Sequence, residues 1–338
     1  MKLLGLVAIC LAAALSSACG HPSGCRTPSR GSGLSAEVCL AEASFTMGAQ
    51  PLARPEGTKG TSAPMPKNDW VPAHGVHVSR FFLDAYEVTW SRYRACADAG
   101  FCGTDGISRY PATAALLRDP TAANRPVWGV TWNEALRFCA WKGKRLPTEA
   151  EWERASRGSE GRQYPWGNEP PPPSLLSERT FYGPSSTDPS KLPPAAGSQP
   201  KDVTPDGVHD LFGGVDEWVA DWYDTGYVRF AGKSDPQGPP APVLVEEQQP
   251  GLGWVNAHGG KVVRGRRWNS SGGTAWNIEQ LGAPAWLREE RSPDGSAGFR
   301  CARDDRFPGE RPRGGVARVQ GVSWRWLRGS NPLDGGFP

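Results

Sequence analysis

The chain has 338 residues, with 38 Lys and Arg against 35 Asp and Glu, so its formal net charge is only +3. This balance excludes a nucleic-acid-binding protein that works through bulk positive charge, and the hydrophobic fraction of 38% excludes a multi-span membrane protein. Because Gly and Pro break helices, the 42 Gly and 33 Pro, together with 15 Trp, favour a loop-rich domain over a long-helix bundle.

Residues 1–18 have the pattern of a signal peptide, with one Lys followed by an apolar run that is too short to cross a bilayer. Small residues ending at Ala18 precede Cys19, as in a bacterial lipobox, although Ser16 stands where Leu is usual. We therefore expect export to the bacterial cell envelope (outer membrane or periplasm). Cys19 would be lipidated there, and the lipid anchor would be the only membrane contact. Cleavage after Ala18 without lipidation is the alternative.

The Gly-, Pro- and Ser-rich residues 19–40 are predicted to form a flexible tether, followed by a globular domain over residues 41–305. In this domain a strand is expected to end at the turn glycine Gly48, and alternating apolar residues over 76–82 predict further strand structure. Thr89 is expected to cap a short helix that ends near Gly100.

Two helices carry stronger signals, because Thr131 with Glu134 and Thr148 with Glu151 form capping boxes. The Pro-rich stretch 168–205 predicts a long irregular loop. Residues 261–268 and 298–303 are expected to form short buried strands. Residues 306–338 form a Gly-, Pro- and Arg-rich tail.

Export permits disulfide bonds, and six cysteines lie beyond the signal segment and Cys19, which allows 15 pairings. Cys96 and Cys102 are close enough in sequence for a local bridge, and we also expect a bridge between Cys25 and Cys39. The sequence holds no CxxC motif and only five His, so it gives almost no support to a zinc or thioredoxin-type site.

Several motifs, in this order along residues 40–305, together resemble the formylglycine-generating enzyme, or sulfatase-modifying factor, family. The motifs are Phe45-x-Met47-Gly48, Glu87-Val88-Thr89, Pro126-Val127-Trp128-Gly129-Val130-Thr131-Trp132, the block from Gly143 to Glu153 (GKRLPTEAEWE), Gly213-Gly214-Val215-Asp216-Glu217-Trp218, Val263-Arg264-Gly265 and Gly298-Phe299-Arg300-Cys301. The resemblance implies an irregular α+β fold of the C-type-lectin-like kind, low in regular secondary structure and disulfide-bonded. It also implies a structural disulfide between Cys139 and Cys301.

Catalytic members of that family oxidise a cysteine of a client sulfatase to formylglycine, using O₂ and a Cu(I) ion held by two cysteines. Carrying the family pattern over residue by residue places Ser270 at the first cysteine position and Ala275 at the second. Neither a hydroxyl nor a methyl group replaces a thiolate as a ligand for Cu(I), a soft ion. The sequence therefore predicts that copper is not bound and that oxidase activity is absent.

Arg266 and Arg267 replace the small residues that are usual in this stretch and, with Trp268, outline a possible ligand cleft. One interpretation is an anion-binding cleft, and the other is two surface arginines. The family's calcium site also maps onto this chain, with side-chain oxygens of Asp210 and Glu217 and backbone carbonyls of Gly213 and Val215 as ligands. A hydrogen-bonded turn without metal is the alternative for that loop.

The sequence leaves three hypotheses. In the main one, the chain is a non-oxidising family member, a pseudoenzyme, that binds a peptide, a protein or a glycan at the cell envelope. The second is a formylglycine-generating oxidase that matures a client sulfatase. The third is a structural envelope lipoprotein, which would show no saturable binding to any envelope component.

Overall fold

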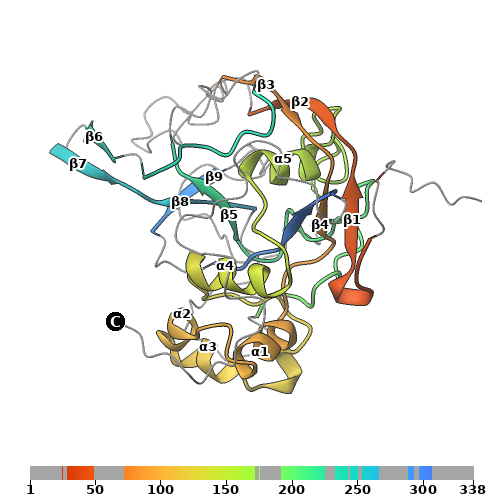
Figure 1. The fold of residues 1–338 in the computed structure, drawn as a ribbon, viewed down its shortest axis with the longest axis vertical. Helices are drawn as coiled ribbons and strands as arrows, with labels where there is room; N and C mark the ends of the chain where they lie inside the picture. The colour runs from red at the N-terminus through yellow and green to blue at the C-terminus, as the bar shows by residue number, and fades with distance from the viewer. Residues whose placement is uncertain are drawn as a thin grey trace, which may run out of the picture.

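The computed structural model describes residues 25, 29–48, 72–171, 175, 192–224, 233–242, 244–249, 253–265, 288–292 and 297–306. Within these ranges the chain forms short helices and two- or three-stranded antiparallel sheets joined by irregular segments (Figure 1). This architecture confirms the predicted α+β fold with little regular secondary structure. In the part of the chain that is described, no helix is long and apolar enough to cross a membrane.

A three-stranded sheet joins the two ends of the domain, with strand order β1–β4–β10. Strand β1 (Glu37–Leu40) pairs with β4 (Phe81–Asp84), which pairs on its other edge with β10 (Ala302–Asp304). Strand β1 lies inside the predicted tether 19–40, so the ordered domain begins earlier than its predicted boundary. The apolar Leu40 and Phe82 explain this shift, because both are fully buried in the pairing.

Strands β2 (Ala43–Met47) and β3 (His74–Val78) form a second antiparallel pair. Strand β2 ends before Gly48, whose φ of +76° suits a glycine, as the sequence predicts. Phe45, Val76 and Val78 are buried beneath this pair. Helix α5 packs against both strands and lies next to them in Figure 1.

The five α-helices in the described ranges are short. They are α1 (Trp90–Asp98), α2 (Asp105–Ser108), α3 (Pro111–Leu116), α4 (Trp132–Trp141) and α5 (Glu149–Arg157). The two helices that the capping boxes predict, α4 and α5, begin directly after Thr131 and Thr148. The Thr131 hydroxyl accepts from the Glu134 amide, and the Thr148 hydroxyl accepts from the Glu151 amide. Helix α1 begins after Thr89 as predicted, although the Thr89 side chain makes no capping hydrogen bond.

A second three-stranded sheet has the order β5–β8–β9, formed by Glu217–Trp222, Lys261–Arg264 and Arg288–Arg291. The predicted strand 261–268 is therefore present as far as Arg264, and residues 266–268 lie outside the described ranges. The hairpin of β6 (Leu244–Gln249) and β7 (Gly253–His258) projects from this side of the molecule in Figure 1. The predicted strand 298–303 begins only at Ala302, as β10.

The core consists of two large buried clusters. One lies between α1 and α4 and contains Trp90, Phe138 and Trp218. The other lies between α5 and the strands and contains Trp152. Burial of three large tryptophans explains how a domain of short elements holds together, because such side chains remove much apolar surface from water.

Candidate functional site

The loop from Asp210 to Glu217 leads into β5 and gathers acidic side chains from three parts of the chain. Arg300 is the cation at its centre. The Arg300 Nε atom donates to both carboxylate oxygens of Glu217, at 3.0 and 2.8 Å, and Nη2 donates to Oε1 at 2.7 Å. Trp152 Nε1 donates to Glu217 Oε2 at 3.0 Å. All three side chains are buried.

This geometry tests the predicted calcium ligands, and they do not fit a calcium ion in this arrangement. The two Glu217 oxygens already accept four donor contacts, which uses the lone pairs that a carboxylate offers. Asp210 Oδ2 accepts from the Gly197 amide at 2.5 Å. Among the described residues, no group of three or more His, Cys, Asp or Glu has the arrangement of a metal site. The Arg300 guanidinium thus supplies the positive charge that an ion would bring, and calcium binding by the chain stays a prediction.

Three further carboxyl groups surround the ion pair, and no salt bridge joins them to a cation in the described part of the chain. Burial, together with the charge of Asp210, raises the pKa of Asp202 to about 7, and burial raises the pKa of Asp210 to about 6. Burial and the neighbouring Glu217 and Asp210 charges raise the pKa of Glu87 well above its usual value. One oxygen of Glu87 accepts from the Val215 amide at 2.7 Å, and the other is buried without a hydrogen-bond partner.

A second buried cluster joins α5 to β8. Arg264 donates to Glu149 at 2.8 Å through Nη1 and to Glu153 at 2.9 Å through Nη2, and all three side chains are buried. Against the effect of burial, Arg264 and Arg157 hold the pKa of Glu153 below its usual value. These glutamates therefore join the first turns of α5 to the last residue of β8.

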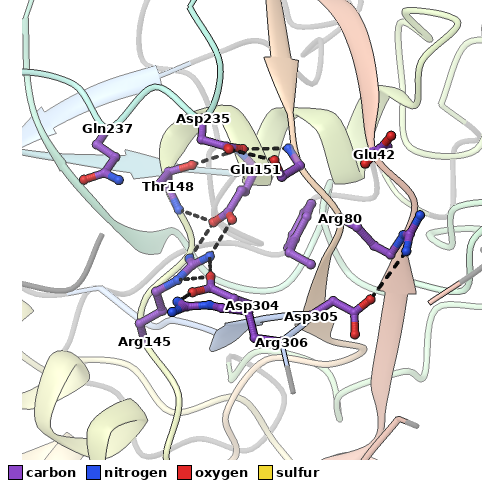
Figure 2. A pocket seen from close by; sticks show the side chains of 12 residues that line it. Glu42, Arg80, Arg145, Thr148, Glu151, Asp235, Gln237, Asp304, Asp305 and Arg306 are labelled. Carbon is purple, nitrogen blue, oxygen red and sulfur yellow. Dashed lines mark hydrogen bonds and ion pairs between the residues drawn. The ribbon is translucent and has the colours of Figure 1, made fainter. Parts of the chain in front are cut away.

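A cavity of about 230 Å³ opens between the start of α5, the β3–β4 turn, the 235–237 segment and the end of β10 (Figure 2). We call it the Asp235 pocket. Its lining residues are Glu42, Ser79, Arg80, Phe81, Arg145, Thr148, Glu151, Asp235, Gln237, Asp304, Asp305 and Arg306.

One wall of the Asp235 pocket is an ion-pair network centred on Arg145. Its guanidinium donates to both oxygens of Glu151, at 2.7 and 2.6 Å, and to Asp304 at 3.0 and 2.5 Å. Asp304 also pairs with Arg306. On the opposite side, Asp235 accepts from the Ser79 amide at 2.6 Å and the Ser79 hydroxyl at 2.7 Å (Figure 2). In this wall Arg145 and Arg306 balance the charges of Glu151 and Asp304. Asp235 accepts hydrogen bonds from Ser79, and its charge also acts on Arg145.

Comparison with known proteins places this fold. The chain matches the model of the sulfatase-modifying factor enzyme 1-like domain over residues 27–305. The chain belongs to this family. The formylglycine-generating enzyme of Mus musculus is 28% identical over 348 residues, which cover 87% of this chain and 88% of that protein.

Two further relatives bear on this sulfatase-modifying factor domain. The inactive C-alpha-formylglycine-generating enzyme 2 of Mus musculus is 32% identical over 203 residues, covering 48% of this chain and 65% of that protein. The structure of PvdO from Pseudomonas aeruginosa is similar with a TM-score of 0.51 and 23% identity, covering 80% of this chain and 94% of that chain. The latter likeness concerns the fold alone.

The six cysteines of the domain form the three expected pairs. Cys25 pairs with Cys39, Cys96 with Cys102, and Cys139 with Cys301, at Cα separations of 6.2, 5.4 and 5.5 Å. The Cys139–Cys301 bridge ties α4 to the segment that carries Arg300. The two cysteines left in the sequence are Cys10, in the predicted signal segment, and Cys19, at the predicted lipidation position.

Several predicted site residues lie outside the described ranges. They are Cys19, Arg266, Arg267, Trp268, Ser270 and Ala275. Strand β8 ends at Arg264, and Gly265 is the last described residue before Arg266.

Sequence reasoning missed the Asp235 pocket completely. Arg145, Thr148 and Glu151 belong to the recognisable GKRLPTEAEWE block, but Asp235 and Asp304 lie far from it in sequence. The structure distinguishes Asp235 by its left-handed backbone, with a φ of +51°. That conformation does not follow from the sequence alone, although Asp tolerates it better than most residues.

Proposed function

We propose that this sulfatase-modifying factor domain is a non-oxidising member that acts as a binding module for a peptide, a protein or a glycan at the cell envelope. The observation that carries the proposal is the loss of thiols. Ser270 and Ala275 occupy the two positions where the family's catalytic cysteines are expected. The six cysteines of the domain are paired in disulfides, so they offer no substitute thiolate.

The chemistry of copper supports this proposal. Cu(I) prefers soft sulfur ligands, and the oxidation of a client cysteine needs the metal held beside the reacting thiol. A serine hydroxyl and an alanine methyl provide no sulfur ligand and therefore do not hold the metal beside that thiol. The relative in Mus musculus that is named an inactive enzyme is compatible with a family branch that keeps the fold without the activity.

The location at the envelope is part of the same proposal. Its support is the short apolar run of residues 1–18, followed by Cys19. Intact mass of the membrane-extracted protein tests it. We expect a mass that corresponds to a chain beginning at Cys19 with attached acyl groups, and a free N-terminal Cys19 would contradict lipidation.

A conversion assay separates the proposed function from its rival, the formylglycine-generating oxidase. The purified protein, supplied with Cu(I) under air, is incubated with a Cys-x-Pro-x-Arg peptide, and mass spectrometry follows the loss of the thiol to the aldehyde. We expect no conversion beside a working family enzyme as positive control. Conversion of the peptide would overturn the proposal.

A variant sharpens this assay. The double substitution Ser270→Cys with Ala275→Cys restores the family's thiol pair, and Ser271→Cys with Ala275→Cys serves as a control with the wrong spacing. Gain of copper binding only in the first variant would support the assignment of these two positions. Equal copper binding by both variants would mean that the positions are misassigned.

A further inference from the structure

An aromatic side chain lies exposed beside the end of α4. Phe101 has 48% of its surface exposed, and it stacks on Trp141 with ring centroids 6.2 Å apart. Trp141 is itself only partly buried against the core. Arg137, in α4, and Lys142, directly after α4, are both exposed. We call these four residues the Phe101 patch, which combines aromatic rings and two cations on one surface.

The backbone holds Phe101 in one position. Phe101 lies between the disulfide-bonded Cys96 and Cys102, and its amide donates to the Cys96 carbonyl at 3.1 Å. Gly100, with a φ of +77°, turns the chain just before it. A single exposed apolar side chain is ordinary on a protein surface. The significance of this one therefore depends on the charges beside it.

The cations of the patch are not balanced by ion pairs. The Lys142 ammonium lies 3.7 Å from the centroid of the Trp141 ring, and Arg137 forms no salt bridge with a described residue. Burial, together with the positive charges of Arg92 and Lys144, lowers the pKa of Lys142. A negatively charged partner at this surface would therefore stabilise the Lys142 ammonium.

The ion pairs behind the patch also contain more cations than acids. Two carboxylates, of Glu37 and Asp84, pair with three cations, which are Lys144, Arg92 and Arg303. Because these groups are largely removed from water, salt screens their field only weakly. One further positive charge therefore lies behind the patch.

The exposed acids on the neighbouring helices do not cancel this charge. Asp98, in α1, pairs with Arg118 at 3.2 Å, and both side chains are exposed. Asp105, at the start of α2, is the exposed acid that remains on these helices, against Arg137, Lys142 and the excess cation behind them. The surface of the patch is therefore positive, and its electrostatic complement is an anionic surface.

The predicted lipid anchor would hold this side of the domain near a bilayer. Cys19 lies six residues before Cys25, and Cys25 is bonded to Cys39 in β1. Six extended residues span at most roughly 20 Å. Strand β1 is next to the patch, because Glu37 pairs with Lys144 at 2.7 Å. A bilayer that holds the acyl groups of Cys19 would therefore lie close to the patch.

The composition of the patch matches the chemistry of a membrane surface. Aromatic rings favour the boundary between headgroups and acyl chains, and the long side chains of Lys and Arg reach the lipid phosphates from there. A protein partner would have to be recruited to the patch, whereas the anchor keeps a lipid surface within reach at all times.

We propose that the Phe101 patch docks on the surface of an anionic phospholipid bilayer, with the Phe101 ring among the headgroups and with Arg137 and Lys142 at the lipid phosphates. This inference rests on the envelope location in the proposed function. It adds a second membrane contact to a lipid anchor that the sequence predicts as the single one.

Flotation of the unlipidated protein with vesicles tests this inference. The mature chain with Cys19→Ser has no acyl group, so it binds a vesicle only through its own surface. We expect it to float with vesicles of equal parts phosphatidylglycerol and phosphatidylcholine, and to be released as salt is added. Partition into vesicles of phosphatidylcholine alone should be at least about tenfold weaker. Equal partition into both vesicles, or none into the anionic ones, would overturn the proposal.

Charge variants assign the binding to the patch. Arg137→Gln and Lys142→Gln should each lower the partition constant about fivefold, as expected for one cation at an anionic surface. Lys201→Gln, which removes an exposed cation outside the patch, is the matched control and should bind as the parent chain does. The Arg-rich tail 306–338 is present in every variant, so differences among them report the patch. Equal partition by both patch variants and the control would contradict the proposal.

Variants of Phe101 test the contact of the ring with the lipid. Phe101→Ala changes an exposed side chain and should lower the partition constant about fivefold with an unchanged melting temperature. Phe101→Trp should keep the binding, because tryptophan favours the membrane interface. If Phe101→Ala binds as the parent chain does, the ring does not enter the lipid and the proposal is wrong.

Inorganic phosphate distinguishes a lipid surface from a site for a free anion. Vesicle binding should be the same in phosphate and in chloride of equal ionic strength, and its loss in phosphate alone would overturn the proposal. The intact-mass measurement separates the two levels of the inference. Absence of vesicle binding with an acylated Cys19 rejects only the patch, whereas a free N-terminal Cys19 rejects lipid anchoring in the proposed function.

Discussion

The two buried clusters around Arg264 and Arg300 use the same residue types with opposite electrostatic results. Arg264 lies between Glu149 and Glu153, and Arg157 adds a second cation to Glu153 at 2.9 Å. Arg300 binds Glu217, while Glu87, Asp202 and Asp210 lie around this pair and form no salt bridge with another described residue. The first cluster keeps the pKa of a buried acid low, and the second raises the pKa of three. Burial acts against the charged carboxylate in both clusters, so the difference between them comes from the number of cations beside each acid.

The largest expected effect comes from removing Arg300, the cation that pairs with the acid-rich cluster among the described residues. Arg300→Ala leaves Glu217 buried without its cation. It also removes the donor that Arg300 provides to the carbonyls of Asp84 and His209. We expect a loss of about 5 kcal/mol in the free energy of unfolding, measured by urea denaturation. The control is Arg118→Ala, which breaks an exposed pair with Asp98 and should cost less than about 1 kcal/mol. A similar loss in both variants would contradict the central role of Arg300.

A smaller but still large loss is expected in the balanced cluster. Arg264→Met removes the cation between two glutamates, but Glu153 keeps Arg157. We expect a loss of about 3 kcal/mol in the same measurement. Adding Glu149→Gln to that variant should recover part of the loss, because it removes the uncompensated charge. If the second substitution destabilises the chain further, the ion pair is not what holds this position.

The pH dependence of stability should come from the acid-rich cluster. The folded-state pKa of Asp202, about 7, lies above its ordinary value of 3.8. The folded state therefore binds more protons between these values, and stability is fully present below pH 4 and is lost as the pH rises through about 7. We expect the free energy of unfolding to fall by roughly 2–3 kcal/mol from this group between pH 5 and pH 8. Asp202→Asn should flatten the curve, and an unaltered curve would assign the effect to other groups.

The smallest expected effect is that of calcium. Since Arg300 already balances Glu217, we expect millimolar calcium to shift the melting temperature by less than about 1 °C relative to EDTA. An ion bound at 100 times its dissociation constant would stabilise the fold by about 2.7 kcal/mol and raise the melting temperature by several degrees. A rise of that size would show that the loop rearranges to release Glu217, and would restore the predicted site.

Local signals in the sequence predict local structure well in this chain. The capping threonines Thr131 and Thr148 bond within their own first turn, so four consecutive residues contain the whole signal. Strand β1 was missed because its pairing partner, β4, lies more than 40 residues away and the surrounding composition is that of a tether.

The sites divide in the same way. The absence of cysteines at positions 270 and 275 can be read directly from the sequence, because identity at a matched position needs no geometry. The calcium prediction, by contrast, depends on a contact that the sequence does not show, because Arg300, 83 residues from Glu217, donates to the Glu217 carboxylate. The Asp235 pocket also depends on segments that no local pattern connects.

The sequence by itself determined the family, the helix starts and the absence of cysteine at positions 270 and 275, because each depends on residue identity at short spacing. Only the tertiary structure decided which carboxylates are paired, which remain unbalanced and where a cavity opens. Those properties depend on distances between residues that are far apart in the sequence, such as Ser79, Arg145, Asp235 and Asp304. Electrostatic energy follows distance in space and burial, and neither can be read from separation along the chain.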